Sequence, residues 1–295
     1  KPDIVQTWMY HADLIGGVAA KISGVKKIFW NIRYTGLSSD YTKKSTKTIA
    51  KLCALMSRWI PEKIICCAPK VKTTHAEFGY AKEKLVVVNN GYDIHQFSPN
   101  KIDRNILRRK YNINENSFVL GMVGRYNPIK DHANLVEAMS ILKASSFEFT
   151  CVLVGGGLVP ENKEILNLLI DYGLIKNVKL LGQQSNIPAI MNMLDIHVLS
   201  SVSEAFPNVI AEAMACGIPC VSTNVGDAQL IIGCTGWIVR TQNSTELATA
   251  IMEAGKIKQQ ESQKWEHIKN EARKRIVDDY SLDSMIRKYN DIWLN

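Results

Sequence analysis

The chain has 295 residues, of which 46% are hydrophobic, so it can bury sizeable cores and falls in the size range of two domains. No apolar run approaches the roughly 18 to 20 residues of a membrane-spanning helix, and no signal-peptide pattern opens the sequence. The net charge of +8 is confined to residues 1–100, which hold 15 Lys and Arg against 7 Asp and Glu, whereas residues 101–295 hold 21 of each. Seven cysteines form no CxxC pair and mostly lie in apolar segments. We therefore expect a soluble, cytoplasmic protein with reduced cysteines and two domains of different electrostatics.

The first hundred residues alternate short apolar runs with helical patterns, which predicts a parallel sheet covered by helices. The predicted strands are Asp3 to Thr7, Lys27 to Trp30, Lys63 to Cys67 and Lys84 to Val88. The chain begins directly on a strand and without Met. We expect that this domain lacks its opening strand and helix units, roughly 60 to 90 residues.

The segment from Lys43 to Ile60, "KKSTKTIAKLCALMSRWI", is predicted to form a basic amphipathic helix. One interpretation is an ordinary surface helix with a solvated face. The other is contact with an anionic membrane surface or a lipid-phosphate substrate. Nucleic acid is not expected as a partner, because no recognised binding motif accompanies the charge.

The second half predicts another sheet of the same kind, after a polar segment (residues 94–117) with a short basic helix, "RNILRRKY". Its predicted strands are Phe118 to Val123, Phe149 to Val154, Val178 to Leu181, Ile196 to Leu199, Pro219 to Ser222 and Trp237 to Val239. From residue 244 onward the pattern is helical, with Ser244 and Ser281 as expected N-caps. The fold class is therefore α/β with two Rossmann-like domains.

The loop "GRYNPIKDH", Gly124 to His132, follows a predicted strand and opens a helix that begins near Asp131. Open α/β sheets bind ligands at such loops, and a helix amino terminus favours anions. Arg125 and Lys130 place two cations there, which suits a diphosphate. For this loop alone, two ordinary surface cations remain the alternative.

A glycine turn, "VGGGLVP" from Val154 to Pro160, also follows a strand. A dinucleotide fingerprint would require glycine where Pro160 stands. The turn is therefore interpreted as a tight turn or a place where backbone approaches a ligand. A dehydrogenase ranks last among the functions considered.

The segment "SEAFPNVIAEAMACGIPCV" contains two glutamates, Glu204 in a loop after a strand and Glu212 inside the following helix. Pro207 suits the first helical position. The amides from Phe206 to Val209, which include Asn208, can then face an anion or a sugar hydroxyl. A buried carboxylate needs a partner, and Glu212 can accept both hydroxyls of a ribose.

Together these motifs resemble those of the retaining GT-B glycosyltransferases of family 4, which carry a GR-x-x-x-x-KD phosphate loop and an E-x7-E motif within EGFPNVLLEAMACGxPVV. The resemblance covers essentially the whole second half, and "VNNGYDIHQF" is similar to the family's entry to the interdomain linker. It implies a GT-B fold, with two Rossmann-like domains facing a cleft. Residues 1–100 would form a partial acceptor-side domain, residues 101–280 the nucleotide-sugar domain, and residues 281–295 a helix packing back on the first.

By this resemblance, Arg125 and Lys130 neutralise the donor diphosphate, Glu212 holds the ribose, and Glu204 contacts the donor sugar near the reacting carbon. Gly124, Phe206, Pro207 and Asn208 supply further donor contacts. Such an enzyme uses no metal or other cofactor, because cations and helix amides stabilise the leaving diphosphate. Retention of anomeric configuration is carried over from the family.

The first domain is expected to bind the acceptor, with His11 in the loop after a strand as a catalytic candidate. The chain departs from the family at Asn31 to Arg33, where many members carry a histidine. It also departs at "VGDAQLII" (residues 225–232), where the family often has GG…E. We therefore expect the donor sugar of this enzyme to differ from that of family members that keep these motifs.

The favoured function is a retaining transferase that moves a sugar from a UDP-linked donor to a glycan or lipid-diphosphate acceptor in surface polysaccharide synthesis, at the inner face of the plasma membrane. Two alternatives stay open. One is another GT-B enzyme, such as a sugar-nucleotide epimerase. The other is a catalytically silent nucleotide-sugar-binding module.

Overall fold

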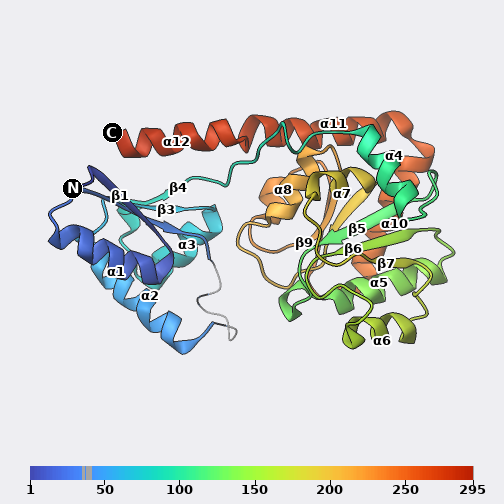
Figure 1. Cartoon of the computed structure of the whole chain (residues 1–295), viewed down its shortest axis with the longest axis horizontal. Helices are drawn as coiled ribbons and strands as arrows, with labels where there is room; N and C mark the ends of the chain where they lie inside the picture. Colours follow the sequence, from blue (N-terminus) through green and yellow to red (C-terminus); the bar gives the residue numbers. More distant parts are fainter. Residues whose placement is uncertain (35–36, 38–41, 295) are drawn as a thin grey trace. The chain divides into compact units, whose positions relative to one another are not determined.

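The computed structural model describes residues 1–34, 37 and 42–294. Packing divides the described chain into two compact units (Figure 1). The first unit is formed from segments 1–91, 204–206 and 282–295, and the second from segments 92–203 and 207–281. Each unit is built around one parallel sheet, as the alternating pattern predicts.

The sheet of the first unit has four strands in the order β1-β2-β3-β4, all parallel. The strands are β1 (Ile4–Trp8), β2 (Lys27–Ile32), β3 (Lys63–Cys66) and β4 (Leu85–Val87), which confirms the four predicted strands. Helices α1 (Met9–Ile22), α2 (Lys44–Met56) and α3 (Pro69–Phe78), with the 3-10 turn η2 (Lys82–Lys84), lie between them in the chain. Phe29, Trp30 and Ile32 of the central strand β2 are fully buried, as expected for a strand covered on both faces.

The last helix of the chain, α12 (Leu282–Leu294), belongs to this first unit. Tyr289 is buried against Ile65 and Val88. The indole nitrogen of Trp293 donates to the side-chain oxygen of Gln6 at 2.8 Å, and the Lys27 ammonium donates to the Trp293 carbonyl at 2.9 Å. The carboxyl-terminal helix therefore completes the packing of the amino-terminal sheet.

The sheet of the second unit has six parallel strands in the order β10-β9-β8-β5-β6-β7. The strands are β5 (Val119–Val123), β6 (Thr150–Val154), β7 (Val178–Leu180), β8 (Ile196–Leu199), β9 (Cys220–Thr223) and β10 (Trp237–Val239), which confirms the six predicted strands. The chain builds outward from β5 in one direction and from β8 in the other. The strand order therefore switches between β5 and β8, where open α/β sheets bind ligands.

Helices cover both faces of this sheet (Figure 1). They are α4 (Lys101–Lys110), α5 (His132–Ala144), α6 (Lys163–Asp171), α7 (Ile187–Met193), α8 (Asn208–Ala215), α9 (Ala228–Ile232), α10 (Ser244–Gln260) and α11 (Ser262–Asp279), with the 3-10 turn η3 (Pro128–Lys130) before α5. Helix α5 packs on α6 and α10, whereas α7 packs on α4 and α8, and α8 on α11. Leu120, Leu135 and Leu153 are among the fully buried residues of the core.

One helix start near the end of the chain differs slightly from expectation. Asn243, rather than Ser244, caps α10, because its side-chain oxygen accepts from the Glu246 amide at 2.9 Å.

All seven cysteines are free thiols; six are buried and Cys234 is exposed, as the apolar setting of most of them predicts. None of the helices in the described part of the chain is long and apolar enough to cross a bilayer.

Candidate functional site

The loop between β5 and α5 is held in shape by its own side chains. The Asn127 side-chain oxygen accepts from the Ile129 amide at 3.0 Å and caps η3. Asp131 lies in the left-handed region with a φ of 48° and caps α5 through the Asn134 amide at 3.3 Å. Two consecutive caps therefore fix the backbone that carries Arg125 and Lys130, and the expected helix start near Asp131 is confirmed.

The two cations of this loop lie in different surroundings. Lys130 is half-buried. A Cβ added at Gly124 would lie 3.5 Å from the Lys130 Cε, so the lysine side chain crosses directly over that glycine. Arg125 is exposed and makes no hydrogen bond or ion pair with any described residue. Its guanidinium is therefore available to a ligand.

Two buried histidines lie behind Lys130. Burial, with the Lys130 charge as a second cause, lowers the pKa of His132 to about 4 and that of His197 to about 3. The imidazole of His197 accepts from the amide of Val123, the last residue of β5, at 3.4 Å. Both rings are therefore neutral at neutral pH, which leaves the positive charge of this end of the sheet to Lys130 and Arg125.

The glycine turn after β6 packs against this loop. Gly155 has a φ of 148°, and a Cβ there would lie 2.1 Å from the Gly124 carbonyl oxygen. The Tyr126 amide donates to the Gly156 carbonyl at 2.7 Å. The backbone approach that the structure shows is to the neighbouring loop, and an approach to a ligand stays a prediction.

The loop after β8 is tied to the loop after β5. The Ser200 hydroxyl donates to the Lys130 carbonyl at 2.9 Å, and the Val202 amide donates to the Ile129 carbonyl at 2.9 Å. The structure thereby joins two segments that are about 70 residues apart in the chain, at the switch point of the sheet.

Helix α8 opens beside this loop with an uncapped first turn. It begins at Asn208, one residue later than expected, and Pro207 occupies the N-cap position without a side-chain hydrogen bond. The first amides of such a helix point out of its end and attract anions. The Asn208 side-chain oxygen accepts from the Tyr92 hydroxyl at 2.7 Å, which orients that residue.

Glu212 lies in the second turn of α8 and is half-buried among buried apolar residues. Its carboxylate makes no hydrogen bond or ion pair with any described residue. Burial raises the pKa of this carboxyl above its usual range. A charged group in this setting is stabilised when a ligand supplies hydroxyl donors.

Three predicted site residues belong to the first unit, namely His11, Glu204 and Phe206. His11 was expected in a loop, but it is exposed in the first turn of α1. The loop is missing because the chain turns from strand to helix at a single residue, Met9, with a φ of 69°. Glu204 is half-buried and Phe206 is buried, and the roles of all three stay predictions.

Sequence reasoning missed what Asn31 and Arg33 do inside the first unit. The Asn31 amide nitrogen donates to the Tyr289 hydroxyl at 2.5 Å, and the Arg33 guanidinium donates to the same hydroxyl at 3.2 Å. These residues anchor α12, which leaves less of their hydrogen-bonding capacity for a sugar. No local pattern reveals a partner more than 250 positions away in the chain.

The family model of the glycosyl transferases group 1 matches residues 103–275. The chain is 26% identical over 302 residues to an Escherichia coli protein named UDP-Gal:alpha-D-GlcNAc-diphosphoundecaprenol alpha-1,3-galactosyltransferase, and the match covers 100% of this chain and 76% of that protein. It is 28% identical over 290 residues to the capsular polysaccharide biosynthesis glycosyltransferase CapM of Staphylococcus aureus, over 95% of this chain and 73% of the relative.

Solved structures show the same fold. Anabaena HepE in complex with UDP superposes with a TM-score of 0.86 at 24% identity, over 97% of this chain and 77% of that one. Sucrose-phosphate synthase from Thermosynechococcus elongatus superposes with a TM-score of 0.83 at 19% identity, over 99% of this chain and 73% of that one. The family match spans more than half of the chain and includes both tied loops, so this chain belongs to the glycosyl transferases group 1 and is a glycosyltransferase of the GT-B fold.

Proposed function

We propose that this glycosyltransferase moves a sugar from a UDP-linked donor, with retention of configuration, to a glycan or lipid-diphosphate-linked acceptor in the synthesis of a surface polysaccharide or glycolipid. The printed names of the two relatives support this choice. One uses a UDP-galactose donor and a diphosphoundecaprenol-linked acceptor, and the other acts in capsule synthesis. The UDP complex of the Anabaena neighbour has the same fold.

The observation that carries the proposal is the pair of tied loops at the switch point. These loops carry an unpartnered guanidinium and a lysine, and the second loop leads into the uncapped start of α8, with an unpartnered carboxylate one turn further along that helix. Cations and open amides suit a diphosphate, and a carboxylate suits the two hydroxyls of a ribose. A nucleoside diphosphate offers both groups in one molecule.

In the proposed reaction, the bond between the anomeric carbon and the β-phosphate oxygen breaks, and the electron pair leaves with UDP. Arg125 and Lys130, with the α8 amides, stabilise the growing negative charge, and no metal is required for this role. Each charge-assisted hydrogen bond contributes about 1.5 to 3 kcal/mol. The acceptor hydroxyl attacks the same face, and its proton passes to the leaving phosphate. Glu204 and His11 would orient the sugar and the acceptor.

The charge and exposure of α2 favour an acceptor at a membrane surface. Leu55 of α2 and Trp59, just after it, are 60% and 63% exposed, and Lys44 and Lys51 of α2 are exposed as well. Exposed apolar side chains among lysines are typical of helices that lie on anionic lipid. We place the enzyme at the inner face of the plasma membrane on this basis.

The proposal is tested by titrating the purified chain with UDP, uridine, GDP and ADP, followed by an assay for UDP released from each UDP-sugar. We expect UDP to bind most tightly and one UDP-sugar to be consumed in the presence of a lipid-diphosphate acceptor. Binding without turnover would instead support a silent nucleotide-sugar-binding module.

Replacing both loop cations, Arg125→Ala with Lys130→Ala, should weaken UDP binding at least about tenfold and leave uridine binding unchanged, because only the diphosphate loses its partners. Lys176→Ala with Lys179→Ala removes the same charge elsewhere in the second unit and serves as the control. Equal losses for UDP and uridine would reject the phosphate role.

A further inference from the structure

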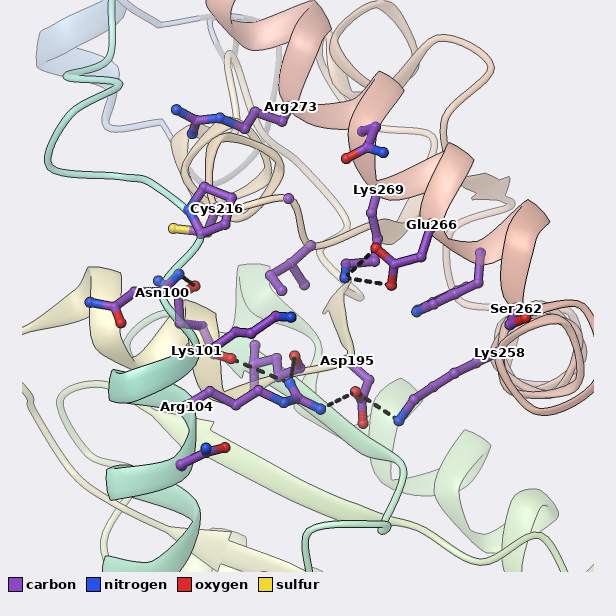
Figure 2. Close-up of a pocket in the computed structure, with 18 residues that line it drawn as sticks. Asn100, Lys101, Arg104, Asp195, Cys216, Lys258, Ser262, Glu266, Lys269 and Arg273 are labelled. Carbon is purple, nitrogen blue, oxygen red and sulfur yellow. Dashed lines mark hydrogen bonds and ion pairs between the residues drawn. The ribbon is translucent and has the colours of Figure 1, made fainter.

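The second unit contains a cavity of about 590 Å³ that is separate from the loops described above (Figure 2). It is lined by Pro99 and the first turns of α4, by Asp195, which immediately precedes β8, and by residues of α10 and α11. The strands are parallel, so a residue that precedes β8 lies at the opposite end of the sheet from the loop that follows it. The cavity and the proposed donor site therefore lie at opposite ends of the strands of one sheet.

The side chains that line the cavity carry an excess of positive charge. Two of them are carboxylates, Asp195 and Glu266. Five are cationic, namely Lys101, Arg104, Lys258, Lys269 and Arg273. A concave surface lined mainly by one sign of charge concentrates ions of the other sign.

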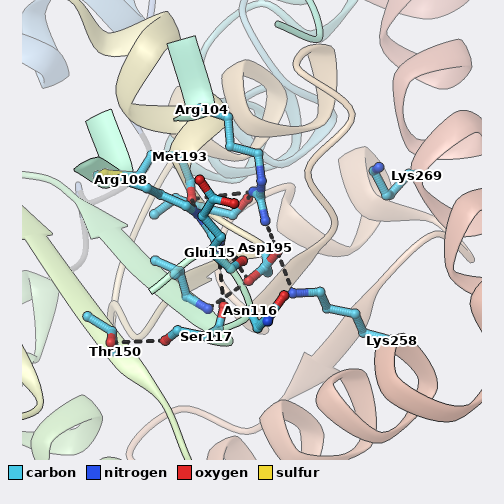
Figure 3. A network of polar contacts seen from close by, with 12 residues as sticks. Arg104, Arg108, Glu115, Asn116, Ser117, Thr150, Met193, Asp195, Lys258 and Lys269 are labelled. Carbon is cyan, nitrogen blue, oxygen red and sulfur yellow. Dashed lines mark hydrogen bonds and ion pairs between the residues drawn. The ribbon is translucent and has the colours of Figure 1, made fainter. Parts of the chain in front are cut away.

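The buried carboxylate of Asp195 is shared among three cations (Figure 3). One oxygen accepts from Arg104 at 2.6 Å and from Lys258 at 2.8 Å, and the other accepts from Arg108 at 2.9 Å. One negative charge thus faces three positive ones. The Arg104 and Lys258 side chains remain 26% and 24% exposed, so their uncompensated charge reaches the cavity.

The rest of the lining offers further donors. Lys101, at the first position of α4, is exposed and has no ion-pair partner among the described residues. Lys269 is paired only with Glu266 at 2.9 Å, an interaction at the surface that costs little to break. The 18-residue helix α11 begins at Ser262 without a side-chain cap, and Ser262 lines the cavity. Its open amides add a positive helix end to the cationic wall.

Both arginines of the lining are already committed to structure. The Arg273 guanidinium donates to the carbonyls of Ile94 at 3.2 Å and Phe97 at 3.1 Å, and also to that of Ala215. Arg273 therefore fixes the wall of the cavity, and so does Arg104, whose guanidinium donates to the Leu194 carbonyl at 2.7 Å as well as to Asp195. Lys101 and Lys269 are the groups that can turn toward a ligand.

We propose that this cavity is a second ligand site, which binds a small molecule carrying a phosphate ester, of the size of a hexose phosphate. The ammonium groups of Lys101 and Lys269, beside the net positive charge of the Asp195 cluster, suit a phosphate dianion. Trp265, which is mostly buried in the core, contributes a small apolar part of the lining. The volume is within the range of small-molecule sites. This site does not depend on the proposed donor chemistry, because it shares none of its residues.

The test is calorimetric titration of the whole chain with glucose 6-phosphate, with inorganic phosphate, and with glucose as the uncharged control. We expect both phosphates to bind, the ester more tightly, and glucose not to bind. Lys101→Gln with Lys269→Gln should weaken glucose 6-phosphate at least about tenfold. Both side chains are at the surface and outside the Asp195 network, so the fold, checked by circular dichroism, should be kept.

Two matched variants locate the binding. Lys176→Gln with Lys179→Gln removes the same charge elsewhere and should leave the affinity for glucose 6-phosphate unchanged. Arg125→Ala with Lys130→Ala should also leave it unchanged, whereas UDP binding falls. Loss of glucose 6-phosphate binding in this last variant would assign it to the donor site and overturn the proposal. No binding at millimolar concentration, or equal loss in the Lys176 and Lys179 control, would overturn it too.

Discussion

Glu212 illustrates, at the scale of one residue, how an unsatisfied group points to a ligand. Its carboxylate is half-buried, its pKa is raised by burial, and it has no hydrogen-bond or ion-pair partner among the described residues. Burying a charge without compensation costs free energy of folding. The folded protein nevertheless retains this carboxylate, as expected if a bound molecule compensates the unfavourable free energy of its burial.

Glu212→Ala should therefore weaken UDP binding at least about tenfold, because two charge-assisted hydrogen bonds to the ribose are lost. The free energy of unfolding should stay the same or rise, since the buried charge is removed. Calorimetric titration and urea denaturation measure the two quantities. The exposed Glu253→Ala on α10 is the control, and unchanged UDP affinity in a folded Glu212→Ala protein would sink the ribose assignment.

At the scale of the element, the turn after β6 shows how a glycine shapes a neighbouring loop. Gly155 lets its backbone pass against the Gly124 carbonyl, where a Cβ would lie only 2.1 Å from the oxygen. Gly156, next in the chain, has open space at the same position and no left-handed φ. A side chain is therefore excluded at Gly155 but can be accommodated at Gly156.

Gly155→Ala should lower the melting temperature and weaken UDP binding, because the loop bearing Arg125 must shift to admit the methyl group. Gly156→Ala should change neither quantity appreciably. Thermal melts and UDP titrations of the two variants side by side test this pair. Equal effects of both substitutions would show that the approach to Gly124 is not what matters.

The basic helix α2 allows a second test at this scale. Lys47→Glu with Lys51→Glu should reduce cosedimentation with phosphatidylglycerol vesicles at least about tenfold, since each lysine near an anionic surface contributes about 1 kcal/mol. Neutral phosphatidylcholine vesicles and the Lys176→Glu with Lys179→Glu variant are the controls. Unchanged binding would leave α2 as an ordinary solvated helix.

Across the whole molecule, buried titratable groups set the response to pH. His75, His132 and His197 are buried, and burial lowers their pKa values to about 4, about 4 and about 3. Their unfolded pKa is about 6.5, so the unfolded chain binds more protons as pH falls below that value. The three histidines therefore destabilise the folded protein in acid.

Carboxyls whose pKa values are raised by burial act in the opposite direction, and Asp13 has the largest shift among them. Burial raises the pKa of Asp13 to about 7, despite the hydrogen bond from Thr7, so its carboxyl stays protonated in the folded state and favours folding at lower pH. The large pKa shifts of three histidines outweigh the one large opposing shift, that of Asp13, which predicts a net loss of stability between about pH 6.5 and pH 4. The midpoint of urea unfolding should be lower at pH 5 than at pH 7, and an equal midpoint would contradict the burial of these imidazoles in neutral form.

The sequence alone determined the elements of this protein. Continuous apolar runs such as "VLGMV" belong to parallel strands that are buried on both faces, and their alternation with helical patterns leaves few folds open. The loop that carries Arg125 and Lys130 and the helix that carries Glu212 could be located because a loop that follows a predicted strand and opens a helix marks each of them. The turn at Met9 could not be predicted, because a non-glycine residue with positive φ leaves no local signal.

Only the tertiary structure decided which distant groups meet. Ser200 meets Lys130, Tyr289 meets Asn31, and Asp195 meets three cations because the strand order and the returning helix bring them together. These contacts depend on sheet topology and side-chain burial, which are set by packing over the whole unit. Local propensity acts over a few residues, so it specifies where a strand ends but not which side chain, a hundred or more positions away, completes the site.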